Sequence, residues 1–116
     1  MKFVDLDTKI SVVELEKMSE KMFGRLVKAV VDIEKEIMVV DASMHVDQEV
    51  VLLENGSRQE NLWGINLHPS QFGGEKWIEF DSLINLRPSQ GNRSRSIDDP
   101  KIQEKIRKIV DKLVEK

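Results

Sequence analysis

The 116-residue sequence contains no cysteine, which excludes thiol nucleophiles, disulfides and cysteine-ligated zinc or iron–sulfur centres. It also has no apolar run approaching the roughly 18–20 residues that cross a bilayer. The first residues lack the apolar core of a signal peptide. We therefore expect a cytoplasmic protein with no membrane partner.

Aromatic residues are scarce, at 5% of the chain, and none alternates with the basic residues. Trp63 and Trp77 are therefore interpreted first as core residues, not as platforms for stacked bases. There is no P-loop and no GxGxxG pattern, and Ser82, Ser94 and Ser96 lack the context of a serine nucleophile. No catalytic or nucleotide-fold motif directs the interpretation.

The charge balance does not select a partner. The formal net charge of -3 argues against global attraction to nucleic acid, although a local basic patch can still bind phosphate. Hydrophobic residues make up 40% and charged residues 34% of the chain, which is typical of a folded protein. A chain of this length suits one hydrophobic core, so we predict a single domain over residues 1–116.

Helices are predicted near both ends of the chain. Ser11 and Glu14 form a capping box, and the apolar spacing after them predicts a helix over about residues 12–23. Towards the carboxyl end, Asp99 is a good N-cap and Pro100 fits the first helical position. Apolar residues then recur at i, i+4, i+7 and i+11, namely Ile102, Ile106, Ile109 and Leu113.

Strands are predicted between these helices. Two β-branched runs, 26–33 and 37–42, indicate a hairpin, and 62–67 indicates another strand. The clearest strand pattern spans Trp77 to Arg87, and its polar face consists of Glu79, Asp81, Asn85 and Arg87. Residues 46–54 fit a helix slightly better than a buried strand. The order predicts an α+β fold, a mainly antiparallel sheet of about four strands with the N- and C-terminal helices packed on one face.

The most chemically suggestive stretch is the loop after that strand, residues 87–95, called here the arginine loop. It holds three arginines and no acid. Arginine forks match phosphate or carboxylate, and small residues let backbone amides approach an anion. The alternative is a solvated loop whose arginines pair with Asp98, Asp99 or other carboxylates. The leading prediction is a site for a phosphate-containing ligand, a nucleotide or RNA, formed by Asp81, Asn85, Arg87, Gln90, Asn92, Arg93 and Arg95.

The polar strand face supports a second hypothesis, a metal-dependent hydrolase or phosphoesterase. Adjacent strands lie about 5 Å apart, so carboxylates from two of them can share a divalent ion or a proton. The residues concerned are Glu79 and Asp81, joined from the hairpin by Asp32 and Lys28. A further set, usable only if residues 46–54 form a strand, consists of His45, Asp47 and Glu49. No metal ligand is assigned from these patterns.

A third hypothesis is an interaction protein. Leu83 interrupts the otherwise polar face of the long strand, and Trp77 lies on the same strand. An apolar strip or an open sheet edge there would form a homodimer or dock a partner, although single exposed apolar residues are normal. This hypothesis needs no chemistry from the arginine loop.

Three stretches carry a family resemblance. They are residues 28–34 (KAVVDIE), the strings LENGS and QENLWGINL within 53–67, and WIEFDS followed by INLRPSQGNRSR within 77–95. On these residues, the chain resembles over most of its length a family of small bacterial and archaeal proteins catalogued only as a domain of unknown function. The resemblance implies no activity, cofactor or catalytic residue.

Overall fold

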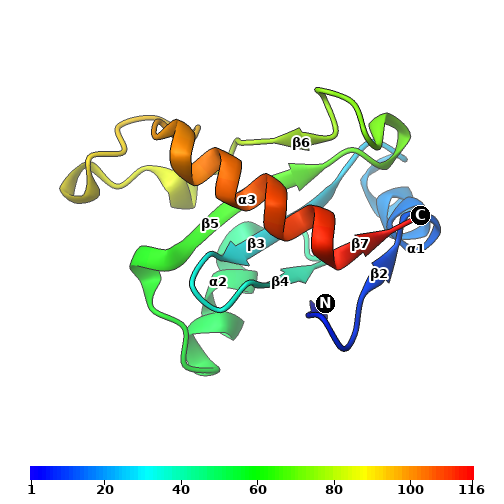
Figure 1. Cartoon of the computed structure of the whole chain (residues 1–116), viewed down its shortest axis with the longest axis horizontal. Helices are drawn as coiled ribbons and strands as arrows, with labels where there is room; N and C mark the ends of the chain where they lie inside the picture. Colours follow the sequence, from blue (N-terminus) through cyan, green and yellow to red (C-terminus); the bar gives the residue numbers. More distant parts are fainter.

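The computed structural model describes residues 1–116 and is built on a five-stranded antiparallel sheet (Figure 1). The strand order is β1-β4-β3-β5-β6. The strands are β1 (Lys2–Val4), β3 (Val27–Asp32), β4 (Ile37–Val40), β5 (Leu62–Leu67) and β6 (Ile78–Glu79). The predicted α+β class and antiparallel sheet are confirmed, with one strand more than expected, because the short N-terminal β1 pairs with β4.

The predicted hairpin forms from β3 and β4, with Val30 opposite Val39. Its turn contains no glycine. Instead, the buried carboxylate of Asp32 accepts hydrogen bonds from the amides of Glu34 (2.9 Å) and Lys35 (3.0 Å). The Asp32 side chain therefore acts in the turn, as Asp often does.

Helices cover both faces of the sheet. Helices α1 (Val12–Ser19) and α3 (Pro100–Leu113) lie on one face, as predicted for the terminal helices, and α2 (His45–Glu54) lies on the other (Figure 1). Both predicted N-caps are present, since Ser11 Oγ accepts from the amide of Glu14 (3.1 Å) and the Asp99 carboxylate from the amide of Lys101 (2.9 Å). The capping box at Ser11 is only half formed, because the Glu14 carboxylate accepts from Lys2 Nζ (2.9 Å) and not from the Ser11 amide. The chain from 45 to 54 is the helix that the sequence slightly favoured.

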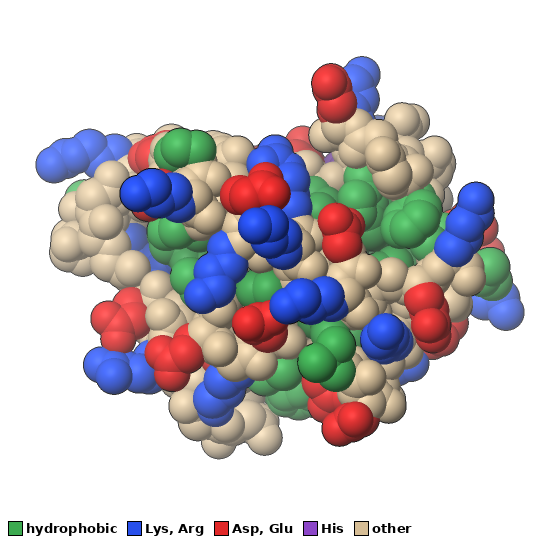
Figure 2. Space-filling view, in the orientation of Figure 1, with side chains coloured by type: hydrophobic (Ala, Val, Ile, Leu, Met, Phe, Trp, Pro, Cys, Tyr) green, Lys and Arg blue, Asp and Glu red, His purple; other side chains and the backbone are tan.

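The main core lies between the sheet and helices α1 and α3, and it contains both tryptophans. A much smaller cluster lies under α2 and consists of Val30, Val39, Leu52 and Leu62. Two further short strands, β2 (Ile10–Ser11) and β7 (Val114–Glu115), pair in parallel next to the helices. No helix has both the length and the apolar character needed to span a bilayer. On the α3 side, Lys and Arg side chains are interspersed with Asp and Glu (Figure 2).

The long strand predicted over Trp77–Arg87 is wrong. Only β6 pairs with β5, and the chain then continues as two 3-10 turns, η4 (Leu83–Asn85) and η5 (Pro88–Gln90). The Ser82 hydroxyl accepts a hydrogen bond from the Ile84 amide (3.3 Å), a local bond that competes with strand pairing. Residues predicted to share one polar face are consequently separated: Asn85 is fully buried, whereas Glu79 is exposed. Leu83 and Leu86 also face solvent.

The remaining 3-10 turns connect the regular elements. They are η1 (Glu20–Met22), which extends α1 almost to the predicted end of that helix, η2 (Gln59–Asn61) before β5, and η3 (Pro69–Gln71) after it. Phe23 and Gly24, both at positive φ, end the first helical segment. Glycine suits such a position, whereas Phe23 is an unusual residue for it.

Candidate functional site

The arginine loop runs along the part of β5 that β6 leaves unpaired. Arg87 donates to the carbonyl oxygens of Gln59 and Leu62 and to Gln90 Oε1, and its guanidinium lies 4.1 Å from the ring centroid of Trp63. Burial lowers the pKa of Arg87 from its ordinary value. The guanidinium therefore braces the edge of β5 and already has its acceptors within the protein.

Asn85 takes the place of a neighbouring strand at Gly64. Its Oδ1 accepts from the Gly64 amide (2.8 Å), and its Nδ2 donates to the Gly64 carbonyl (2.9 Å) and to the Arg95 carbonyl (3.1 Å). A Cβ at position 64 would lie 2.6 Å from the Ser82 side chain, so only glycine fits there. A side-chain amide thus closes the sheet edge that β6 leaves open, which is a protected form of edge.

The turn at 92–98 is closed by its own side chains. Asn92 Nδ2 lies within hydrogen-bond distance of the carbonyl oxygens of Asn85 (2.7 Å), Ser94 (3.0 Å) and Ser96 (2.8 Å). The Asp98 carboxylate accepts from Ser94 Oγ (2.6 Å) and from the Arg93 amide (2.9 Å). The Ser94 hydroxyl and the Arg93 amide hold the pKa of Asp98 below its ordinary value. The Arg93 amide, one of those expected to face an anion, is therefore occupied.

The predicted ligand-binding set divides into two groups. Arg87, Gln90, Asn85 and Asn92 bind other parts of the chain, and Gln90 Nε2 also reaches the Glu60 carbonyl (3.2 Å). Arg95 donates only its Nε to Asp81 (2.8 Å), which leaves its two terminal nitrogens without a protein partner. The side chain of Arg93 is exposed and makes no hydrogen bond or ion pair. Cationic groups of this loop that are open to a ligand are thus Arg93 and Arg95.

Arg95 lines a cleft of about 370 Å³ on the α2 side of the sheet, called here the basic cleft. Lys28 reaches it from β3 and His45 from the start of α2. Apolar and small residues complete the wall, namely Ser43, Met44, Val46, Ser82, Leu83 and Ile84. The lining contains no carboxylate, and the half-buried Lys28 forms no ion pair.

His45 is the most unusual residue of the basic cleft. It is 7% exposed, and its Nε2 lies 2.7 Å from the carbonyl oxygen of Ile65. A carbonyl accepts only, so Nε2 carries the hydrogen, and Nδ1, which has no protein partner, carries the lone pair. Burial lowers the pKa of His45, as do the charges of Lys28 and Arg95, and the hydrogen bond to the Ile65 carbonyl and the charge of Asp81 offset only part of this. The cleft therefore contains a neutral imidazole with an open acceptor nitrogen.

No side chain caps the first turn of α2, because the N-cap position is occupied by Met44. The first-turn amides of a helix have no partner within the helix, and their dipoles favour negative charge. The backbone that begins α2 also lines the basic cleft. The helix end adds its dipole to the positive potential that Lys28 and Arg95 create, and the exposed Asp47 of the first turn offsets part of that dipole.

Two acids lie near the cleft without lining it: Asp81 is paired with Arg95 Nε, and Glu79 is held by Asn66. Lys28, Asn66 and Glu79 are register partners across β3, β5 and β6. Asn66 Nδ2 donates to Glu79 Oε1 (3.0 Å) and to the Asp81 carbonyl (3.3 Å). Asn66 therefore holds the Glu79 carboxylate on the side of β5 away from β3, so that it does not pair with Lys28.

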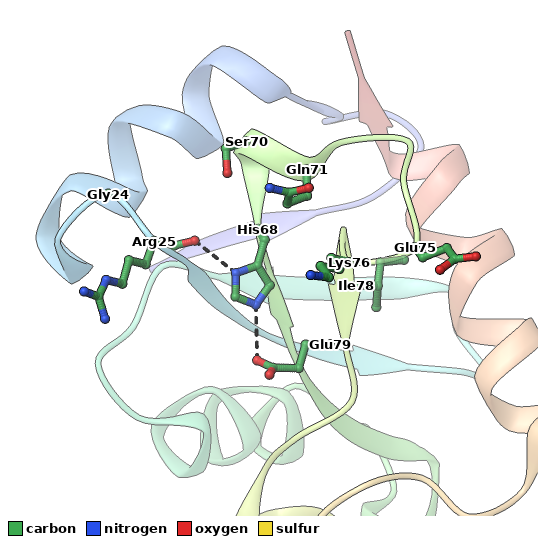
Figure 3. A pocket seen from close by; sticks show the side chains of 9 residues that line it. All are labelled: Gly24, Arg25, His68, Ser70, Gln71, Glu75, Lys76, Ile78 and Glu79. Atoms are coloured by element: carbon green, nitrogen blue, oxygen red, sulfur yellow. Dashed lines mark hydrogen bonds and ion pairs between the residues drawn. The ribbon is translucent and has the colours of Figure 1, made fainter.

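A second, larger cleft of about 670 Å³ lies at the end of β5 (Figure 3). At its centre, His68 is held between the Arg25 carbonyl (Nδ1, 3.1 Å) and the Glu79 carboxylate (Nε2, 3.2 Å). The Arg25 and Glu75 side chains extend away from His68 (Figure 3). Both ring nitrogens already have acceptors and the cleft carries both signs of charge, so the basic cleft is the better candidate.

The acids proposed for a metal site do not gather. No group of three or more His, Asp or Glu side chains is arranged to hold a metal ion. Asp32 pairs with Leu62 and Glu79 with Asn66, four residues apart along β5, or about 13 Å. Because residues 45–54 form a helix, Asp47 faces solvent whereas His45 and Glu49 are buried.

The basic cleft was not predicted from the sequence as a unit. Lys28 and His45 were each noted, but in different hypotheses and apart from Arg95. Strand alternation does place Lys28 opposite the main core. The approach of α2 and the arginine loop to Lys28 depends on tertiary packing, which no local pattern encodes.

Comparison with known proteins supports the family resemblance and adds no activity. Neither the curated proteins nor the solved structures contain a match to this chain. A family model described as a protein of unknown function (DUF5674) matches residues 5–113, nearly the full length. The chain therefore belongs to the DUF5674 family.

Proposed function

We propose that this protein binds a small phosphate-bearing molecule in the basic cleft. The observation that carries the proposal is the convergence of Lys28, His45 and Arg95, from three separate elements, on one hollow whose lining lacks a carboxylate. Clefts lined by one sign of charge concentrate counter-ions, and low-dielectric walls strengthen the effect. Of the predicted ligand residues, Arg95 is retained as a direct contact and Asp81 as the residue that orients it.

Each polar group has a distinct role in this proposal. The terminal nitrogens of Arg95 and the ammonium of Lys28 donate to phosphate oxygens, and the start of α2 adds its positive dipole end. His45 cannot donate through Nδ1, because that nitrogen carries the lone pair. It accepts instead from a hydroxyl group, either on a singly protonated phosphate or on a sugar next to the phosphate.

The size and lining of the cleft favour a ligand with an apolar part. A volume of about 370 Å³ lies in the range of small-molecule sites, about 300–1,000 Å³. Met44, Val46, Leu83 and Ile84 form one part of the wall and the cations another. A mononucleotide or another phosphate monoester with a flat or apolar group matches this division.

The test is a calorimetric and NMR titration with inorganic phosphate, a ribonucleoside monophosphate and the parent nucleoside. We expect the monophosphate to shift the amide signals of residues 43–46, 82–84 and 95, and the nucleoside to bind much more weakly. Lys28→Met should lower the affinity about 10–100-fold, the value of one charge-assisted hydrogen bond. Lys105→Met, on the exposed side of α3, is the matched control.

Three results would speak against this proposal. They are an absence of shifts with all three ligands, an equal loss of affinity in the Lys105 control, or unchanged affinity in Lys28→Met. The Lys105 control also distinguishes RNA binding from binding of a small phosphate-bearing molecule. Lys101, Lys105 and Lys108 form a row on α3 at i, i+4 and i+7, which is a separate basic surface. Binding that falls steeply with salt and depends on Lys105 would place a polyanion on α3 instead.

A further inference from the structure

Helix α2 departs from the usual amphipathic arrangement, because several polar residues are buried and several apolar residues are exposed. Toward the sheet it buries His45, Gln48 and Glu49 together with a single leucine, Leu52. Gln48 is fully buried, and both Gln48 Oε1 and Glu49 Oε2 lack a hydrogen-bond partner. An amphipathic surface helix ordinarily turns its apolar stripe to the core and its polar residues to solvent. The solvent side of α2 therefore needs its own explanation.

That solvent side carries a row of apolar residues next to the exposed acids Asp47 and Glu54. Val46, Val50 and Leu53 follow at i, i+4 and i+7, which places them in one row along the helix. The turn η4 packs against α2 and extends the apolar surface with Leu83, and the exposed Leu86 follows directly after the turn. With Met44, these residues form what we call the α2 patch, and its members are between 39% and 66% exposed.

We propose that the α2 patch is the interface of a homodimer. From the exposed fractions, the patch offers about 500 Å² of apolar surface, near the upper end of the largest patches on monomeric proteins. A standard interface buries about 800 Å² per partner and is about 60% apolar, which is an apolar area of the same size. A second copy of this chain therefore supplies the cover that the patch requires.

The charges at the two sides of the patch are complementary under two-fold symmetry. Asp47 follows Val46 and Glu54 follows Leu53 by one position along the helix. One position is a rotation of about 100°, so both acids lie on the same side of the Val46–Val50–Leu53 row, the side away from η4. Both are exposed, whereas the opposite side carries Arg95. A two-fold axis along the seam between α2 and η4 lays the acidic side of one subunit over the basic side of its partner.

This geometry brings α2 of each subunit onto η4 of the other, and it sets Arg95 opposite Asp47 of the second copy. Met44, Val46 and Leu83 belong to both the patch and the wall of the basic cleft. The dimer would consequently border the cleft. The apolar contacts of the interface do not depend on what the cleft binds, whereas Arg95 belongs to both the interface and the cleft.

Sedimentation velocity and light scattering, over about 1–100 µM protein, provide the test. We expect the mass to rise from 13.4 kDa toward twice that value with concentration. Val50→Glu and Leu83→Glu, on different elements, should each hold the protein at the monomer mass with unchanged circular dichroism. Val13→Glu, at an exposed valine on α1, is the matched control and should still dimerise. Asp47→Arg should weaken the dimer, and Arg95→Asp in the same chain should restore it.

A wild-type chain that stays monomeric at every concentration would overturn the proposal, as would a dimer that survives both Val50→Glu and Leu83→Glu. Co-sedimentation of a monomer with phosphatidylcholine vesicles would assign the patch to a lipid surface instead, and would equally overturn it. Val50 does not line the basic cleft, so loss of the dimer in Val50→Glu is distinguishable from loss of phosphate binding.

Discussion

Replacement of Asn85 by alanine tests how the edge of β5 is closed. The wild-type amide satisfies the buried N–H and C=O of Gly64 at 2.8 and 2.9 Å, and it also donates to the Arg95 carbonyl. Alanine leaves both Gly64 groups without a partner in a site with no exposed surface. Each orphaned buried group costs about 1–3 kcal/mol, and the cavity adds to this, so we expect a loss of about 3–5 kcal/mol.

Asn85→Asp refines the same test because it keeps the shape and removes only the donor. The new carboxylate would face the carbonyl oxygens of Gly64 and Arg95, so burial and these neighbours raise its pKa. A raised pKa means that the destabilisation relative to wild type is greatest above the folded pKa and shrinks as the pH falls through it. The protonated acid donates again, as Nδ2 does in the native protein.

Urea unfolding followed by circular dichroism measures the free energy of unfolding of both variants and of the wild type between pH 4 and 8. The control is Asn55→Ala, at an exposed asparagine whose side chain makes one local hydrogen bond. The control should lose about 1 kcal/mol or less. A loss below about 1 kcal/mol in Asn85→Ala would refute the argument that this amide replaces a strand. A stability gap in Asn85→Asp that stays constant with pH would refute the assigned donor.

Three further predictions concern the same region. Arg87→Lys keeps the charge but should lower the free energy of unfolding in urea by about 1–3 kcal/mol, because an ammonium cannot bridge the Gln59 and Leu62 carbonyls while lying flat on Trp63. An unchanged urea midpoint would contradict this. Gly64→Ala should destabilise the protein by about 1–3 kcal/mol, because its Cβ would lie 2.6 Å from the Ser82 side chain. Ser82→Gly in the same chain should restore part of the lost stability. Thermal melts of the single and double variants measure both effects. Burial lowers the pKa of His45 below its unfolded value, so the free energy of unfolding of the wild type should fall as the pH drops below about 6.5 and level off below the folded pKa. His45→Gln should lack this pH-dependent component. Identical pH profiles of the two proteins would show that His45 does not titrate this way.

The elements that the sequence predicted well are those defined by local chemistry. The caps at Ser11 and Asp99 mark helix starts because a side-chain oxygen meets an amide two or three residues on, whatever the rest of the fold does. The β3–β4 hairpin likewise follows from two β-branched runs. The single domain over 1–116 stays a prediction.

The long strand failed for a physical reason that the sequence contains only indirectly. Alternation at 77–87 satisfies the strand pattern, but Ser82 and Asn85 both have side chains that bond to backbone groups. Such residues offer the chain an alternative to the ladder. Whether the alternative is taken depends on Gly64, which lies on another strand and lets the chain approach closely. The outcome is therefore tertiary, and local alternation cannot decide it.

The residues of this region that bind other parts of the chain still influence the proposed site, because they position Arg95. The Arg95 carbonyl accepts from Asn85 Nδ2 (3.1 Å) and from the Ser82 amide (3.0 Å), and its Nε is held by Asp81. Fixing the backbone and one nitrogen restrains the Arg95 side chain at the wall of the basic cleft and leaves its two terminal nitrogens free. A ligand that meets pre-positioned donors loses less entropy on binding than one that must order a loose loop. Phosphate affinity should therefore fall in the folded variant Asp81→Asn, even though removal of the Asp81 charge also removes a repulsion of the anion. A rise in affinity would show that this repulsion outweighs the positioning of Arg95 by Asp81.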